Sequence, residues 1–329
     1  MNYSDISPRT SAHADLKLLE KAEINNILGK FGDAKTLPKK KSQTITFRRY
    51  SKVDSTPAAL QEGVTPVGKS MTATDISCVL RQYGDFIRTT DVIADTHEDP
   101  VLNEATDVLA EQAAEMMDKM RAGVLKAGTN AQFTNGTERA HVNTVLSRDF
   151  LRTCVRVLKG QEAQPITQLI KAGSAQSTYP IPSAFVAVCH SNLQPDIERI
   201  DGFTPVSEYA SNMGVIPGEV GAVGEMRFVF DNNLSAWADT GGLKAGAGYT
   251  VLSTTGTAAD VYPVLIFAKH AYGVVSLAGK TGVETLVSNP KPQAGDELAQ
   301  KGSVGWKAWS GAVILNDAWM LRIETAAKG

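Results

Sequence analysis

The sequence contains few cysteines, no long apolar run and no large excess of charge of either sign. Its three cysteines, Cys78, Cys154 and Cys189, are isolated and form no CxxC pair. That spacing excludes a disulfide framework and a cysteine zinc site, and it indicates a reducing compartment. No run of about 18 apolar residues is present, which excludes a transmembrane helix. The amino-terminal MNYSDISPRT lacks the pattern of a secretory signal, so we expect a soluble protein made in the cytoplasm.

Sequence motifs of catalysis and cofactor binding are also lacking. None of the five histidines has the HExxH spacing, and no GxSxG elbow occurs. The glycine-dense stretch 241–248 contains neither a Walker lysine nor a GxGxxG pattern, and it predicts a flexible surface loop. His190 follows Cys189, but neighbours on a strand point to opposite faces, which disfavours a nucleophile pair. The sequence therefore assigns no catalytic residue, no cofactor and no metal ligand.

The charge balance narrows the range of partners. A net charge of −2 and a pI of about 6.2 argue against a strongly basic surface for nucleic acid. Lys39, Lys40 and Lys41 form a short basic run, which a solvated linker explains more simply than a phosphate contact. An enzyme with an unrecognised carboxylate site in the glycine-rich region 203–260 remains an alternative. A closed, deep pocket lined by two or more acidic residues from that region would support it.

The chain is organised around a long helix predicted over residues 97–128. Asp99 is suited to cap its first amide groups, and Pro100 fits the first helical position. This capping explains the run His97, Glu98 and Asp99 better than a metal site does. Apolar residues at intervals of three, four and seven form one stripe along the helix, and Gly128 is a natural stop.

A ribbon with polar groups on both faces precedes this helix. Residues 44–50 alternate as a strand, residues 51–74 are rich in turn formers, and residues 75–95 resume a strand pattern. Residues 44–96 therefore predict a long hairpin with a loop of more than 20 residues, a length that is often functional. A two-stranded hairpin is marginal alone in water. We expect it to be ordered by packing against another subunit.

The rest of the chain predicts an α+β fold. An amphipathic helix is predicted over Asp15–Phe31, and the sequence leaves open whether its apolar face covers its own core or a partner. The other predicted elements are a helix over Val145–Leu158 with Ser147 as its cap and Cys154 inward, a buried strand at Ala184–Cys189, a strand at Met226–Phe230, two strands within Asp260–Leu277, and two strands at Trp306–Leu315 and Trp319–Glu324 joined by a turn at Asn316 and Asp317. A hairpin meeting a different patch on the next molecule makes a heterologous contact, which builds rings, shells or filaments.

An ordered set of short motifs resembles one branch of the tailed-phage major capsid proteins over roughly residues 42–326. No single motif is strong, but their order is specific. The motifs are Glu62-Gly63-Val64-Thr65-Pro66, Asp75-Ile76-Ser77, Gln82-Tyr83-Gly84-Asp85, Thr90-Asp91, His97-Glu98-Asp99-Pro100, Asn103-Glu104-Ala105, Glu111-Gln112-Ala113-Ala114, Gly218-Glu219-Val220-Gly221, Arg227-Phe228-Val229, Asp260-Val261-Tyr262-Pro263, Gly305-Trp306-Lys307 and Ile314-Leu315-Asn316.

The resemblance implies the Hong Kong 97-type (HK97-like) major capsid fold. By position, residues 1–41 are expected to form an N-terminal arm and residues 42–96 the extended loop. Residues 97–184 are expected to form the spine helix and peripheral domain, residues 185–272 the axial domain, and residues 273–329 the return strands of the peripheral domain.

The resemblance also implies a structural, non-enzymatic function. The expected protein self-assembles through hexamers and pentamers into an icosahedral phage head, a virion capsid assembled in the host cytoplasm around double-stranded DNA without sequence specificity. Scaffolding, portal and decoration proteins are possible partners, and no membrane is expected. An encapsulin-like nanocompartment shell with the same fold is the alternative to a phage head.

Six residues are selected as candidate intersubunit contacts: Arg48, Arg49, Glu62, Thr65, Lys69 and Asp85. They lie in the predicted ribbon, the part of the chain with the least core of its own. Arg48 and Arg49, with Lys39–Lys41, are also candidates for a locally basic inner face, which predicts weak, salt-sensitive affinity for DNA.

Overall fold

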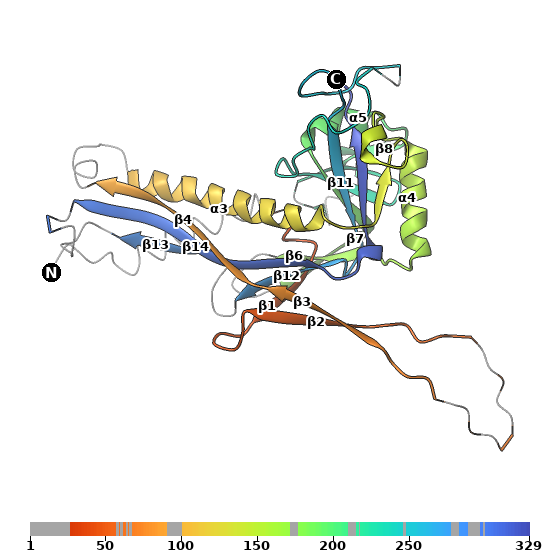
Figure 1. The fold of residues 1–329 in the computed structure, drawn as a ribbon, viewed down its shortest axis with the longest axis horizontal. Helices are drawn as coiled ribbons and strands as arrows, with labels where there is room; N and C mark the ends of the chain where they lie inside the picture. Colours follow the sequence, from red (N-terminus) through yellow and green to blue (C-terminus); the bar gives the residue numbers. More distant parts are fainter. Residues whose placement is uncertain are drawn as a thin grey trace.

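The protein has an elongated sheet and helix, a compact sheet region and a projecting hairpin, arranged as Figure 1 shows in a computed structural model. A five-stranded sheet and the long helix α3 form the elongated part, and an eight-stranded sheet forms the compact region. The structure describes residues 27–56, 59, 62–63, 65, 68–90, 101–171, 177–209, 215–216, 218–245, 248–277, 283–288, 297–298 and 300–329.

The eight-stranded sheet holds the largest cores because both of its faces are covered. All seven residues of β11 (Val261–Phe267) are buried, as expected for a continuous apolar run in a central strand. The strand order is β5-β15-β11-β7-β10-β9-β8, with β6 paired to β7. The other members are β5 (Ala131–Phe133), β6 (Ile166–Lys171), β7 (Ser177–Cys189), β8 (Phe203–Pro205), β9 (Glu219–Val223), β10 (Met226–Phe230) and β15 (Met320–Ala326).

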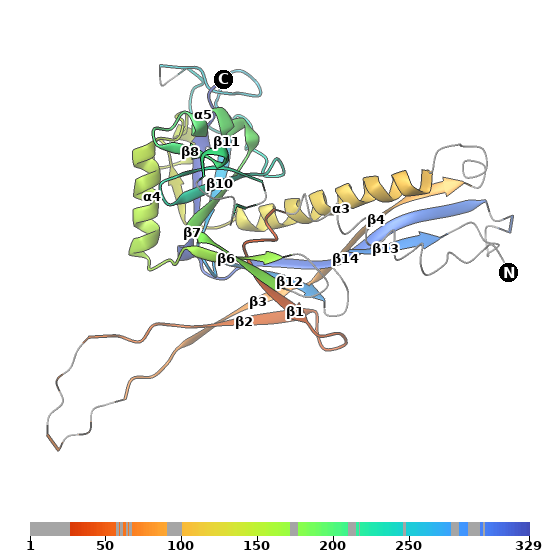
Figure 2. The same ribbon diagram turned by 180° about the vertical axis from the view of Figure 1, so that it is seen from behind.

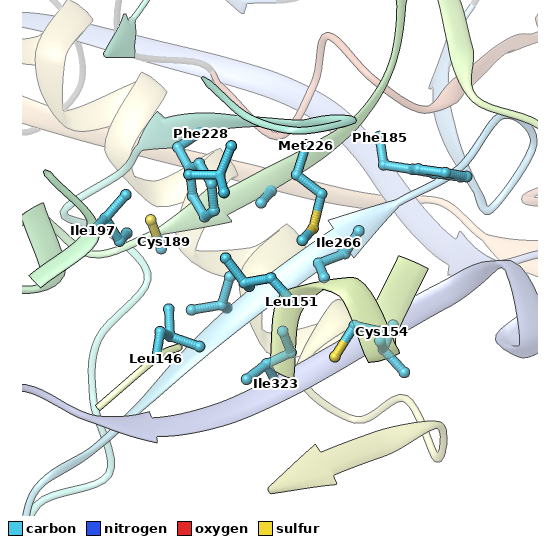
Figure 3. Packing of buried hydrophobic residues seen from close by; sticks show 14 of the residues in the cluster. Leu146, Leu151, Cys154, Phe185, Cys189, Ile197, Met226, Phe228, Ile266 and Ile323 are labelled. Carbon is cyan, nitrogen blue, oxygen red and sulfur yellow. The ribbon is translucent and has the colours of Figure 1, made fainter. Parts of the chain in front are cut away.

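Helix α4 (Arg148–Gly160) covers one face of this sheet. Ser147 caps it, as predicted, by accepting a hydrogen bond from the Phe150 N–H at 3.3 Å. Cys154 is buried in the cluster between helix and sheet, also as predicted, and Figure 3 shows it near Leu151 and Ile323. The short helical segments are η1 (Arg139–His141), η2 (Ser191–Leu193), α5 (Gln194–Glu198), η3 (Val206–Glu208) and η4 (Asp317–Trp319).

Helix α3 (Val101–Leu125) lies along the five-stranded sheet and confirms the predicted long helix. Of the predicted stripe, Ala105 and Leu109 are buried, but Met116, Met120 and Val124 are only half-buried, so the stripe is placed too far round the helix. Ala113 and Met117, which the prediction left out, pack with Leu109 against Val304 and Trp306. The predicted cap and the residues 97–100 lie outside the described part of the chain. The sheet has the order β1-β12-β14-β13, with β4 also paired to β14. Its strands are β1 (Asp33–Leu37), β4 (Arg81–Thr90), β12 (Tyr272–Leu277), β13 (Val283–Ser288) and β14 (Lys301–Ile314).

The predicted ribbon divides into two parts. β2 (Thr44–Tyr50) and β3 (Ala73–Val79) form an antiparallel two-stranded hairpin, with Thr44 opposite Val79 and Tyr50 opposite Ala73. The prediction that the hairpin extends to residue 96 is wrong for β4, which pairs with β14 over ten residue pairs. The side chains on one face of β4 are covered within the same chain, because Tyr83 and Ile87 pack on the core under α3.

The two predicted carboxy-terminal strands are present, but they belong to different sheets. β14 pairs with β4, β12 and β13 in the five-stranded sheet, whereas β15 pairs with β11 and β5 in the eight-stranded sheet. The turn at Asn316 and Asp317 is present, and Asn316 caps η4 by accepting from the Ala318 N–H. The chain therefore passes at this turn from the five-stranded sheet to the eight-stranded sheet.

The amino-terminal helix predicted over Asp15–Phe31 lies largely outside the described residues. Residues 28–32 form turns. Leu28 and Phe31 are buried in a core cluster with residues of α3 and the eight-stranded sheet. The Ile27 N–H donates to Asp118 Oδ2 at 2.7 Å, and the Tyr272 hydroxyl donates to the Leu28 carbonyl at 2.5 Å. The apolar side chains at the end of this segment therefore cover the protein's own core.

Candidate assembly surfaces

The β2–β3 hairpin presents nearly all of its side chains to solvent. In β2, Phe47 alone is buried, and in β3, Cys78 alone is buried. Arg48 joins the strands through two hydrogen bonds to Asp75, Nε to Oδ1 at 2.7 Å and Nη2 to Oδ2 at 2.8 Å. Such an exposed pair fixes geometry but contributes little stability. The hairpin beyond Phe47 therefore has no apolar core of its own.

The connection between the two strands carries three of the predicted contact residues. Glu62 and Thr65 are exposed, and Glu62 precedes Gly63, whose φ of 77° lies in the left-handed region that glycine tolerates. Lys69 Nζ lies 2.5 Å from the Asp54 carbonyl oxygen and 3.3 Å from Asp54 Oδ2, which ties the two sides of the loop together. The hairpin formed by β2 and β3 extends away from the compact region (Figure 1).

The root of the hairpin is anchored, in contrast to its end. Phe47 packs with Leu37, Cys78, Leu80 and Val275 in a small core between β1, β12 and the hairpin. A Cβ atom at Gly273 would lie 2.7 Å from the Phe47 ring, so this close approach requires glycine. Apolar packing therefore holds the hairpin at its root, and just past β2 the exposed Lys52 Nζ lies 2.5 Å from Glu162 Oε1 of the compact region.

Asp85 lies on β4, not on the projecting hairpin. Its Oδ2 accepts a hydrogen bond from Gln112 Nε2 of α3 at 2.7 Å. The Oε1 of the same Gln112 accepts from Trp306 Nε1 at 3.2 Å. Asp85 thus helps to hold the long helix on the sheet within the subunit, a role that the sequence did not suggest.

A cavity of about 380 Å³ lies at the root of the hairpin. Asp33, its one carboxylate, lies 2.7 Å from the Nδ1 of His270. Lys35 Nζ lies 4.5 Å from the centre of the Phe47 ring, and Arg49 is exposed beside it. The remaining lining residues are Arg48, Tyr50, Ile76, Leu315 and Trp319. Cationic and aromatic side chains thus surround a cavity in which the carboxylate is already paired.

A second cavity, of about 410 Å³, lies between α3 and the end of β10, and Glu111, Glu115 and Asp231 contribute to its lining. Burial raises the pKa of Asp231, and it raises the pKa of nearby Asp118 to about 6, with Arg121 opposing the latter shift. Of these acidic lining residues, Asp231 alone comes from the region 203–260. The cavity therefore does not provide the carboxylate pair from that region that the enzyme alternative required.

A buried charge cluster joins α3 to the compact region. Glu324 is fully buried and accepts two hydrogen bonds from Arg139, at 2.6 and 2.8 Å, and it lies 2.9 Å from Arg322 Nε. The Arg139 guanidinium lies 3.6 Å from the centre of the Trp237 ring. Arg322 Nη1 donates to the carbonyl of Gly128, just past the end of α3, at 2.8 Å. These residues are distant in sequence, and no local motif indicated the cluster.

The described residues bring no three histidine, cysteine or acidic side chains into a group that could hold a metal ion. Within the same part of the chain, every helix is too short or too polar to cross a bilayer. Cys189 and His190 do not act together, because His190 Nδ1 accepts from the Asn192 N–H at 3.1 Å while Cys189 is buried in the core. Gly241 and Gly242 are not a free loop, since their N–H groups donate to Ala259 and Val142.

Comparison with known proteins agrees with this architecture. The fold resembles the capsid of Ralstonia phage GP4, with a TM-score of 0.69, 12% identity and coverage of 91% of this chain and 87% of the other. The head structure of Helicobacter pylori bacteriophage KHP40 gives a TM-score of 0.62 at 10% identity, covering 90% of this chain and 87% of the other. The fold is therefore the HK97-like fold of tailed-phage capsids.

Sequence comparison points to the same family. The major capsid protein of Pseudomonas phage KPP21 is 24% identical over 186 residues, which cover 52% of this chain and 46% of that relative. The chain thus aligns with about half the length of this curated relative. The sequence profile described as phage capsid protein matches residues 74–323. Because this match spans well over half of the sequence, the chain belongs to the phage capsid protein family.

Proposed function

We propose that the protein is a major capsid protein whose copies assemble through hexamers and pentamers into an icosahedral phage head around double-stranded DNA. The single observation that carries this proposal is the hairpin formed by β2 and β3. It projects from the body with Phe47 and Cys78 as its only buried side chains. A ribbon of this kind gains order when a neighbouring subunit covers it.

We assign the expected domains to the observed elements, with boundaries set by the strand pairing. Residues 44–79 form the projecting part of the extended loop. Helix α3 with the five-stranded sheet, β4 included, forms the peripheral domain, and the eight-stranded sheet with α4 forms the axial domain. Compared with the sequence-based ranges, α4, β5, β6, the start of β7 and β15 move from the peripheral to the axial domain. β1 moves from the N-terminal arm, and β4 from the extended loop, to the peripheral domain.

The predicted contact residues divide by their position. Arg48, Arg49, Glu62, Thr65 and Lys69 lie on the projecting hairpin and its loop, where a neighbouring subunit can reach them. Asp85 lies in the peripheral domain, so its part in assembly is to keep β4 on α3. We keep the first five as contacts with a neighbouring subunit.

A local excess of positive charge supports the proposal that the shell encloses DNA. Between Asp33 and Asp54 the chain contains Lys35, Lys39, Lys40, Lys41, Arg48, Arg49 and Lys52 and no acidic residue. A surface of this kind attracts phosphates without reading sequence. We expect weak binding that disappears as salt is raised, and tight, sequence-specific binding would contradict this part of the proposal.

The assembly experiment uses the purified full chain. Sedimentation and electron microscopy over a range of protein concentration, salt and crowding agent are expected to show capsomers or closed shells. A protein that remains monomeric under all of these conditions, with no shells or capsomers in micrographs, would overturn the proposed function.

A further inference from the structure

The cavity at the hairpin root has the composition of a receiving site for an acidic residue on an apolar segment. Its volume of about 380 Å³ lies within the range of sites that bind small groups. Aromatic and aliphatic side chains form its walls, and four cationic or ionisable nitrogen groups line it. The lining is Asp33, Lys35, Phe47, Arg48, Arg49, Tyr50, Ile76, His270, Leu315 and Trp319.

Two of the cations in the cavity have no carboxylate partner among the described residues. Asp33 is held by His270, whose φ of 61° places it in the left-handed region, and Arg48 is held by Asp75. Arg49 lies on the same face of β2 as the buried Phe47, because side chains on a strand alternate. Lys35 lies over the Phe47 ring and makes only a long contact, 3.4 Å, with the Thr46 carbonyl. Arg49 and Lys35 can therefore take an incoming carboxylate.

The end of the hairpin has the complementary composition. Between Asp54 and Asp75, Glu62 is the one acidic residue, and its neighbours in sequence include Leu60 and Val64. Glu62 is exposed and has no partner among the described residues. It sits on a turn that Gly63 permits through its positive φ. The turn thus presents an exposed carboxylate.

The two features belong to one chain but cannot meet within it. The hairpin runs away from its own root in both views of the molecule (Figures 1 and 2). Twelve residues separate Tyr50 from Glu62, which allows a reach of about 40 Å at roughly 3.3 Å per residue. That reach is comparable with the diameter of a domain, so the turn can contact the root of an adjacent copy.

Building on the proposed shell function, we propose that the Glu62 turn of one copy docks in the hairpin-root cavity of the next copy, with the Glu62 carboxylate on Arg49 and Lys35. The contact is heterologous, because donor turn and receiving cavity are different surfaces, and repetition around a ring leaves neither unpaired. Each hairpin is then held at both ends, at its own root and at its neighbour's.

A charge-reversal cycle tests the pairing. Arg49→Glu and Glu62→Lys are each expected to raise the protein concentration needed for assembly by about tenfold or more, because each places like charges together. The double variant Arg49→Glu/Glu62→Lys is expected to restore assembly. Arg156→Glu, the same substitution on an exposed residue of α4 outside the cavity, is the matched control and is expected to leave assembly unchanged.

A cross-linking measurement tests proximity independently of stability. The native cysteines are all buried, so Arg49→Cys/Glu62→Cys provides the accessible thiols for a short bismaleimide. Assembled particles are expected to yield a ladder of covalent multimers, and a variant carrying either cysteine alone is expected to yield no ladder.

The outcomes separate this inference from the proposed function. If the wild-type chain forms shells while both charge-reversal variants assemble equally well, or if the cysteine variant forms shells without a ladder, the docking site is wrong and the shell function stands. If the wild-type chain never assembles, the shell function itself is wrong.

Discussion

The eight-stranded sheet and the β2–β3 hairpin use strands in opposite ways. Every residue of β11 is buried, whereas β2, of equal length, buries Phe47 alone. The sheet recovers the entropy cost of ordering its backbone by covering apolar surface within the subunit. The hairpin cannot offset this entropy cost in the same way, because its apolar contacts end at its root. The comparison teaches that one chain can contain strands that are covered within the subunit and strands that the subunit leaves exposed, and the second kind is what the proposed assembly would cover.

The largest loss of stability is expected for a substitution in the compact region. Its absence would contradict the contrast between the sheet and the hairpin. Phe228→Ala removes a fully buried ring between α4 and the sheet (Figure 3), and we expect the free energy of unfolding to fall by about 4 kcal/mol. Urea unfolding of the isolated subunit measures this. Phe86→Ala is the matched control, because Phe86 is 55% exposed on β4 and its loss should cost less than about 1 kcal/mol. Equal losses for the two variants would contradict the assignment of the core.

The next largest effect concerns the joint between α3 and the compact region. Glu324→Gln leaves the guanidinium groups of Arg139 and Arg322 without their buried carboxylate, and we expect a loss of about 3 kcal/mol in the same assay. Glu225→Gln removes an equal charge from an exposed pair with Lys159, and it should change stability by less than about 0.5 kcal/mol. A stability for Glu324→Gln equal to that of the wild type would show that the cluster is not coupled to folding.

A smaller effect should appear as a pH dependence of the free energy of unfolding. Burial raises the pKa of Asp118 from 3.8 to about 6, so its protonated form is favoured in the folded state. The resulting stabilisation is fully present below pH 3.8 and is lost as pH rises through about 6, a difference of about 3 kcal/mol in all, of which about 2 kcal/mol falls between pH 4 and pH 7.

Asp118→Asn should remove this pH dependence, because the amide does not titrate while its oxygen can still accept from the Ile27 N–H. Unfolding measured between pH 4 and pH 7, with Asp231→Asn as a second variant, checks the assignment. A pH dependence that persists in Asp118→Asn would place its origin elsewhere.

The smallest effect on stability is expected in the hairpin, and it sharpens the comparison most. Tyr50 and Met71 are 58% and 65% exposed, so Tyr50→Ala and Met71→Ser should change the unfolding of the isolated subunit by less than about 0.5 kcal/mol. The same variants should weaken assembly, as followed by sedimentation. A variant that destabilises the isolated subunit by more than 1 kcal/mol would indicate that the hairpin has a core within its own chain.

Local patterns in the sequence predicted the elements well. The long helix α3 and the alternation of β2 follow from spacing alone, and the cap of α4 follows from Ser147. These features depend on residues that are near one another in the chain. The N-terminal cap predicted for α3 falls outside the described residues and stays a prediction.

Non-local pairing was beyond the reach of the sequence. β14 and β15 are consecutive and joined by the predicted turn at Asn316, and nothing in the sequence indicated that each belongs to a different sheet. Polar and apolar residues alternate in β4 as they would in an exposed hairpin, and its partner β14 lies more than 200 residues further along the chain. The cavity at the hairpin root likewise gathers residues from Asp33 to Trp319, and no local signal marks such a site.

Hydrogen exchange of the backbone amides in β2 and β3, compared between the isolated subunit and the assembled particle, tests the central claim most directly. The amides of residues 48–50 and 73–76 are expected to exchange rapidly in the isolated subunit and to become protected on assembly, while β11 stays protected in both states. Equal, strong protection of β2, β3 and β11 in the isolated subunit would contradict the account.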